Sequence, residues 1–222
     1  MQLWESLPQA RSRRETKQKG PDRTLAGHTV AMTRRLAGTA GPSAVRPMAV
    51  IDDPENDRLI AEAWDLFDRG DYGPGWLRLT EAAKVSRDDP RAAFSLGLVD
   101  AVVNQDWRSA EEHFAACVRC DPENVPSLNN LAIARIFNCD VGGALRHWRT
   151  ILEQRGATSE VVQNLGCVRL LIQQDLVKKR NSFVKLLDNL YADAAVATAT
   201  SFETKSGFHL MALTLPDGQL LG

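Results

Sequence analysis

The sequence lacks most of the features that mark membrane, exported or polyelectrolyte-binding proteins. Its formal net charge is only −1, so the overall charge predicts no nucleic-acid or acidic-surface partner. No apolar run approaches the roughly 18 residues that a membrane span needs. The basic N-terminus is not followed by the apolar stretch of a signal peptide. We therefore expect a soluble protein without a membrane span, not exported by that route.

Cysteine is also scarce. The four cysteines, Cys117, Cys120, Cys139 and Cys167, all fall in helical patterns of a chain too long to need a disulfide framework. We interpret them as reduced thiols, which predicts a cytoplasmic location. A zinc site needs four ligands, and the candidates other than Cys117 and Cys120 are poorly placed. A buried structural thiol is favoured at Cys117, with a thiol redox or metal-binding role for the pair as the alternative.

The residues of catalysis are few and scattered. No two of the four histidines, His28, His113, His147 and His209, share a spacing with an acid or nucleophile that suggests a triad or a metal pair. The glycines at 73–75 and 142–143 lack the Lys-Ser/Thr of a phosphate-binding loop. We therefore predict no enzymatic activity, cofactor, metal or small-molecule substrate.

The N-terminal quarter of the chain has no apolar periodicity. Residues 1–48 carry nine Lys and Arg against three Asp and Glu. Such a segment buries too little surface to offset the ordering of its backbone, so we predict a disordered basic tail over 1–53. Without interleaved aromatics it does not indicate nucleic-acid binding. An arm for acidic surfaces or RNA, a transit peptide and an extension upstream of a start at Met48 remain open interpretations.

From Pro54 onward the sequence repeats itself. Four turn signatures, GDY, QDW, CDV and QDL, place Asp71, Asp106, Asp140 and Asp175 at steps of 35, 34 and 35 residues. A period held over four units indicates a repeat array. Other positions keep it too: Leu96-Gly97, Leu131-Ala132 and Leu165-Gly166; Ala110 and Ala144; Phe114 and Trp148; with Pro90 and Pro122 near unit ends.

These motifs resemble the tetratricopeptide repeat (TPR) family, whose roughly 34-residue helix-turn-helix unit carries a Leu-Gly pair, an alanine, an aromatic and a proline. Small residues let paired helices approach, and the aromatics fill the space between units. The first unit has Gly75 where the small alanine usually stands, and the fourth departs in its second helix as a cap would. We expect an all-α, TPR-like α-solenoid over 54–197, with about three repeats plus a capping helical pair.

The last segment, 198–222, changes character. It has two β-favouring runs, one around Ser206-Gly207 and one before Pro216-Asp217-Gly218, so we predict a short β-hairpin-like extension. Because an isolated hairpin is marginal in water, it should dock on the last helices or pair with another chain.

The resemblance implies a non-enzymatic scaffold or adaptor that binds a peptide or helix of a partner protein in the concave groove of its stacked first helices. An apolar or amphipathic segment would suit this lining, with amides bonding its backbone. Two alternatives stay open: the stripe is core or is covered by the chain's own tail or hairpin, or the protein is a self-assembling subunit that pairs through its C-terminal strands into a homo-oligomer. The implied groove residues are Ile60, Trp64, Phe67, Phe94, Leu98, Val102, Asn129, Ile133, Phe137, Gln163, Asn164, Cys167 and Leu170.

Overall fold

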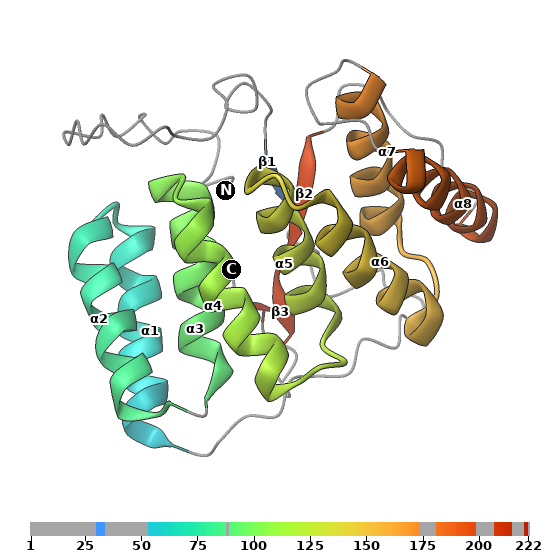
Figure 1. The fold of residues 1–222 in the computed structure, drawn as a ribbon. Coiled ribbons are helices and arrows are strands. Elements are labelled where there is room, and N and C mark those ends of the chain that lie inside the picture. Colours follow the sequence, from blue (N-terminus) through green and yellow to red (C-terminus); the bar gives the residue numbers. More distant parts are fainter. Residues whose placement is uncertain are drawn as a thin grey trace.

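The computed structural model of the chain describes residues 30–33, 53–87, 89–173, 181–198, 207–214 and 220–221. Eight helices and four short strands lie in these residues (Figure 1). The helices are α1 (Pro54–Asp68), α2 (Tyr72–Val85), α3 (Pro90–Val99), α4 (Trp107–Cys120), α5 (Val125–Phe137), α6 (Val141–Arg155), α7 (Ser159–Gln173) and α8 (Asn181–Thr198). A π-helical turn, Asp100–Asn104, extends α3. The strands are β1 (Val30–Thr33), β2 (Phe208–Met211), β3 (Leu213–Thr214) and β4 (Leu220–Leu221).

The repeated Asp signature marks the turn inside each described unit. The residue before the Asp has a positive φ: 85° at Gly70, 53° at Gln105 and 65° at Cys139. This left-handed residue reverses the chain after the first helix. The Asp that follows is the N-cap of the second helix, and the side chains of Asp106 and Asp140 accept bonds from backbone N–H groups three residues on. The fourth signature, at 174–176, lies outside the described residues.

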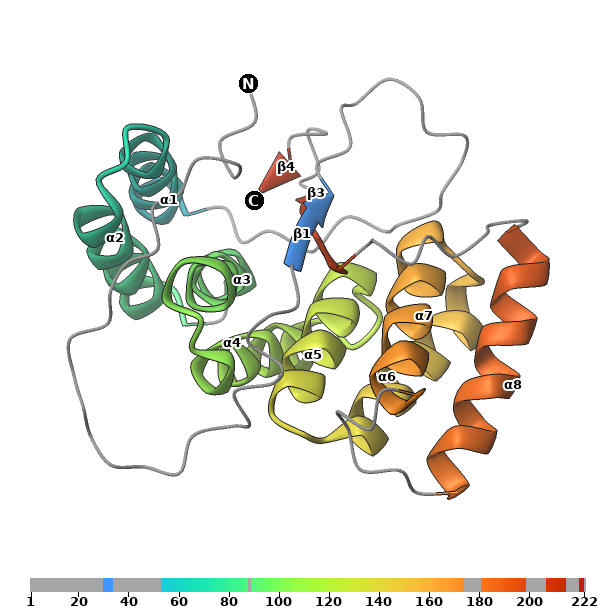
Figure 2. The ribbon, with the colours of Figure 1, turned by 90° about the horizontal axis from the view of Figure 1, so that it is seen from above.

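Consecutive helices pair as hairpins, α1 with α2, α3 with α4, α5 with α6 and α7 with α8. Seen from above, α3, α5 and α7 form one layer, and α4 and α6 form the layer behind it (Figure 2). β1, β3 and β4 lie on the side of the first layer away from α4 and α6 (Figure 2), and β2 packs on α5 and α7. The first helices of the units therefore make a common face, as expected of a solenoid.

The periodic residues pack where the helices of a unit meet. The ring of Phe114 on α4 lies edge-on to Phe94 at 5.7 Å, and both side chains are fully buried. A Cβ added at Gly97 would lie 2.7 Å from that ring, so α3 and α4 can approach this closely only with glycine here. Ala110, Ala144 and Trp148 are also fully buried. The small and large positions of the sequence period thus set the interhelical spacing.

The C-terminal segment contains the expected hairpin-like pair, because β3 and β4 are antiparallel. β2 instead pairs in parallel with β1, residue Val30 facing Phe208. Within the predicted tail of 1–53 the structure describes one short strand, Val30–Thr33, which takes the edge of β2. The rest of that prediction, apart from Asp53, lies outside the described residues. Among the described helices, none is both long and apolar enough to cross a membrane.

Gly75 offers a direct test of the packing in the first unit. A Cβ at this position would lie 2.5 Å from Cε1 of Phe67, whereas a Cβ at Gly73 would meet nothing within 4 Å. We expect Gly75→Ala to destabilise the protein by about 1–3 kcal/mol through overpacking. Gly73→Ala, two residues away on α2, should be neutral or stabilising by up to about 1 kcal/mol. Urea unfolding of both variants measures the difference, and equal stabilities would contradict this packing.

His147 on α6 predicts a pH dependence of stability. Burial, followed by the charges of Arg135 and Arg146, lowers its pKa from 6.5 to about 4. The unfolded chain then binds more protons between these two values, so this group costs stability as the pH falls from 6.5 towards 4. The slope is below the limit of about 1.4 kcal/mol per pH unit because the side chain is half-buried. His147→Leu should lose less stability than wild type between about pH 7 and about pH 5, measured by urea unfolding.

Candidate partner-binding groove

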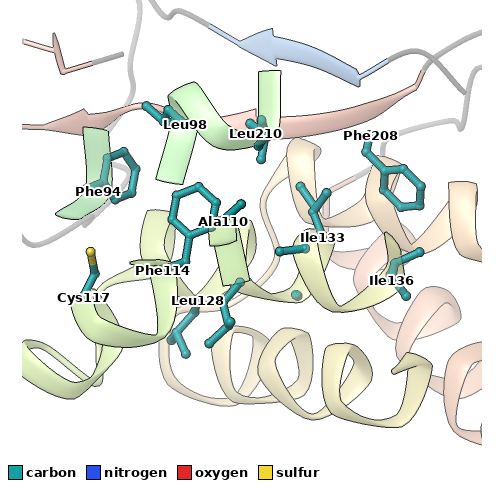
Figure 3. Packing of buried hydrophobic residues seen from close by; sticks show 14 of the residues in the cluster. Phe94, Leu98, Ala110, Phe114, Cys117, Leu128, Ile133, Ile136, Phe208 and Leu210 are labelled. Atoms are coloured by element: carbon teal, nitrogen blue, oxygen red, sulfur yellow. The ribbon is translucent and has the colours of Figure 1, made fainter. Parts of the chain in front are cut away.

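The face made by the first helices is occupied by β2 of the same chain. Phe208 and Leu210 are buried at 1% and 0% exposure, whereas the alternate residues His209 and Met211 are half-buried. Figure 3 shows Phe208 and Leu210 pointing from the strand towards the layer that carries Leu98 and Ile133. β2 thus inserts every second side chain between the helices, as a strand does on a packed surface.

Two asparagines hold the backbone of this strand. Asn164 on α7 donates from Nδ2 to the carbonyl of His209 at 3.1 Å and accepts the N–H of His209 on Oδ1 at 2.7 Å. Asn130 on α5 makes the same pair with Met211, at 2.9 Å to the carbonyl and 2.8 Å from the N–H. Each carboxamide therefore binds one residue through both its backbone groups, as a neighbouring strand would.

A third asparagine connects these contacts to the repeat core. Asn129 donates from Nδ2 to the carbonyl of His209 at 3.0 Å. Its Oδ1 accepts the indole N–H of Trp148 at 3.0 Å and the Nδ2 of Asn164 at 2.9 Å. Asn129, Asn130 and Asn164 are all 0% exposed. Because buried amides must be satisfied, this network fixes the carboxamide orientations that bind the strand.

The repeat sets the spacing of the two asparagines, Asn130 and Asn164, that each clamp one residue of β2 through its N–H and carbonyl. Asn130 and Asn164 are 34 residues apart, each directly before the Leu of a Leu-small pair, so they occupy equivalent positions of adjacent units. Residues two apart in a strand direct their backbone groups to the same edge. One unit of the solenoid therefore corresponds to two residues of strand. Phe208 and Leu210 direct theirs to the other edge, where β1 pairs.

Several of the residues that the sequence implied for the groove gather around β2. Asn129 and Asn164 bind its backbone. The ring of Phe137 lies edge-on to Phe208 at 5.6 Å and stacks on Trp107 at 3.9 Å. Leu98 and Ile133 are fully buried in the same hydrophobic core as Leu210. These contacts place β2 against α5 and α7, with Leu98 of α3 in the same hydrophobic core.

Some of the other implied residues pack within their own units. Phe94 packs inside its own unit, because it and Gly97 share the face of α3 that meets Phe114. Trp64 and Phe67 form an edge-on pair at 5.4 Å within the first unit. Of the remainder, Ile60 and Cys167 are buried, and Val102, Gln163 and Leu170 are half-buried. Apolar residues of a first helix thus pack either on the second helix of the same unit or towards β2. The helical period alone does not tell these two groups apart.

The residues that the sequence implied for the groove did not include Asn130, although it bonds both the carbonyl and the N–H of Met211. The repeat itself carried the signal, because Asn130 and Asn164 are aligned across the period and asparagine is unusual on a buried helix face. The equivalent residue of the preceding unit is Ser95, whose Oγ is buried without a hydrogen-bond partner. The described asparagine clamp therefore spans two units.

Cys117 and Cys120 lie in different surroundings. Cys117 is fully buried, and its thiol lies within bonding distance of the carbonyls of Pro90 and His113. Burial raises its pKa well above the ordinary value, which disfavours the reactive thiolate. Cys120 is exposed. Within the part of the chain that the structure describes, no three His, Cys, Asp or Glu side chains are grouped to hold a metal.

Comparison with known proteins places the fold. No protein-family model matches the sequence, and no curated protein is significantly similar to it. Among solved structures, the crystal structure of MamA superposes with a TM-score of 0.51 at 12% identity, over 67% of this chain and 84% of that one. The TPR domain of Sgt2 from Aspergillus fumigatus gives a TM-score of 0.43 at 16% identity, over 75% of this chain and 93% of that one.

At these identities the likeness is one of fold. The MamA superposition, the paired helices and the repeated turns agree with the period of the sequence. The expected fold class is therefore confirmed: the chain is an all-α, TPR-like solenoid, and short strands are added to its first-helix face.

Proposed function

We propose that this chain is a non-enzymatic protein-interaction scaffold that binds a segment of a partner protein on the face of α3, α5 and α7. The observation that carries the proposal is the pair of two-sided bonds from Asn130 and Asn164 to a strand backbone. Such bonds hold a peptide whatever its sequence, while the neighbouring apolar floor selects its side chains. The TPR-like fold supports the same function by analogy.

The contacts favour an extended segment over the helix that the sequence left open. The backbone N–H groups inside a helix are already bonded within it, so a helix could not offer both its N–H and its carbonyl to one carboxamide. An extended chain has both groups free on alternate residues. The partner segment that suits Asn130 and Asn164 is therefore a strand.

The test is capture of a partner by the full chain. We expect Leu210→Asp, which places a carboxylate on a fully buried side chain of β2, to free the groove and increase capture from lysate. The captured protein, identified by mass spectrometry, should then bind Leu210→Asp when both are purified. The same variant carrying Asn130→Ala and Asn164→Ala should lose that complex. A complex that survives the loss of both asparagines would place the binding surface elsewhere.

Self-assembly through the C-terminal strands is a weaker candidate for this chain. β2 pairs with β1 and β3 pairs with β4 inside the same chain. The other edge of β2 is taken by the asparagines. In this arrangement the strand has partners at both edges without a second copy.

A further inference from the structure

We infer that β2 is an intramolecular stand-in for the partner, so that the partner segment is an extended apolar-x-apolar peptide which must displace β2 residue for residue. This inference rests on the proposed function of the groove. It adds the chemistry of the partner segment and the competition between that segment and β2 for the same face. Phe208 and Leu210 define the apolar positions, and His209 defines the intervening one.

The most deeply buried side chains of the strand stand at alternate positions, Phe208 and Leu210, whereas His209 and Met211 are half-buried. The groove contacts His209 and Met211 through their backbone N–H and carbonyl groups, which every residue except proline has. It buries the side chains of Phe208 and Leu210, with an aromatic contact from Phe137 to the first. A peptide with apolar residues two apart and no proline between or just after them meets both requirements.

The empty groove would need such a peptide. Without β2, Asn130 Nδ2 loses its one recorded acceptor and Asn164 Oδ1 loses its one recorded donor. Asn129 keeps its bonds to Trp148 and Asn164, so the carboxamides stay oriented. Groups already aimed at a backbone bind it with a smaller entropy cost.

The tether makes β2 a strong competitor. Nine residues, 199–207, separate the end of α8 at Thr198 from the start of β2 at Phe208. Binding segments joined by short linkers have effective concentrations on the order of millimolar. The apparent Kd of a partner is then its intrinsic Kd divided by the fraction of molecules whose groove is free, so the partner binds more weakly. Docked β2 thus sets a minimum affinity that a partner segment needs in order to bind.

The experiment uses the full chain and a fluorescent peptide of its own residues 206–214, SGFHLMALT. We expect this peptide to bind Leu210→Asp at least about tenfold more tightly than wild type, by anisotropy titration. Met211→Asp, the same change on the adjacent half-buried residue, is the matched control and should enhance binding much less. Circular dichroism checks that all three chains keep their helices.

Changes in the peptide separate backbone binding from side-chain binding. Methylation of the backbone nitrogen at the His209 position removes the donor to Asn164 Oδ1 and should weaken binding by about tenfold. Methylation at the Leu210 position alters a group at the other edge and should weaken it less. Aspartate at the Leu210 position should abolish binding, and alanine at the His209 position should not.

The outcomes distinguish the two proposals. A peptide that binds no form of the chain would overturn the proposed function, and with it this inference. Equal binding to wild type and Leu210→Asp would keep the groove as a peptide site and overturn the competition. A wild-type dimer that Leu210→Asp dissolves would make a second copy the occupant, which also overturns it.

A second measurement does not depend on a variant. With excess peptide, the amides of β2 in the wild-type chain should exchange their hydrogens faster, since peptide and strand compete for one groove. Unchanged exchange at saturating peptide would show that the two do not compete.

Discussion

Replacing both Asn130 and Asn164 by alanine is expected to release β2 from the helices. The double variant loses four backbone hydrogen bonds at sites that are 0% exposed. At about 0.5–1.5 kcal/mol net for each bond, the docking of the strand should weaken by about 2–6 kcal/mol. Hydrogen exchange should show this as a loss of protection of about 30-fold or more at the amides of His209 and Met211.

Gln163→Ala is the control for this double variant. Gln163 lies next to Asn164 on the same helix, but the structure records no hydrogen bond from it to β2. Its replacement should leave the exchange of both β2 amides within about twofold of wild type. If the double variant also left them protected, the two asparagines would not hold the strand. The amides of α5 serve as an internal reference, because a general loss of protection there would indicate unfolding of the repeat itself.

The sequence predicted the solenoid well because the repeat expresses local rules several times. In the three described turn signatures the Asp is the N-cap of a helix, and the residue before it takes the left-handed conformation. Small and aromatic positions then fix how closely the helices pack, as Gly97 and Phe114 do in the second unit. Each rule acts within one unit, so a single sequence carries repeated copies of the signal.

The occupant of the groove was harder to predict, because β2 docks far from its neighbours in sequence. His209 is 45 residues from Asn164 and 80 from Asn129. The pattern of FHLM shows a short strand, and neither its length nor its composition identifies the surface that it meets. The pairing of β1 with β2 joins residues that are still farther apart in the sequence, because Val30 pairs with Phe208. Such contacts depend on the assembled shape of the solenoid, not on local propensity.

The sequence pattern also did not separate residues that face β2 from residues that pack between helices. First helices in this fold are apolar on more than one face, so a 3.6-residue period predicts burial without naming what covers the side chain. Phe94 proved to belong to the packing between α3 and α4. The polar exceptions were more informative than the apolar stripe. Asn129 and Asn164 are buried, and besides their bonds to neighbouring helices each bonds the backbone of His209.

Replacement of Trp148 is the prediction that joins the repeat core to the groove. The side chain is fully buried on α6, and its indole N–H bonds Oδ1 of Asn129. Trp148→Ala should cost about 3–5 kcal/mol of folding stability through lost packing and a cavity, measured by urea unfolding. Trp148→Phe keeps most of the ring and removes the donor, so its cost should be smaller, about 1–3 kcal/mol.

The phenylalanine variant also reports on the site. Without the indole donor, the Asn129 carboxamide keeps Asn164 as its one recorded donor on Oδ1 and is free to reorient. Its bond to the carbonyl of His209 should then weaken, and the β2 amides should exchange faster than the amides of α5. Equal acceleration at both places would show that Trp148 only packs the repeat. A selective effect at β2 would show that a residue of the repeat motif also orients the groups that bind the strand.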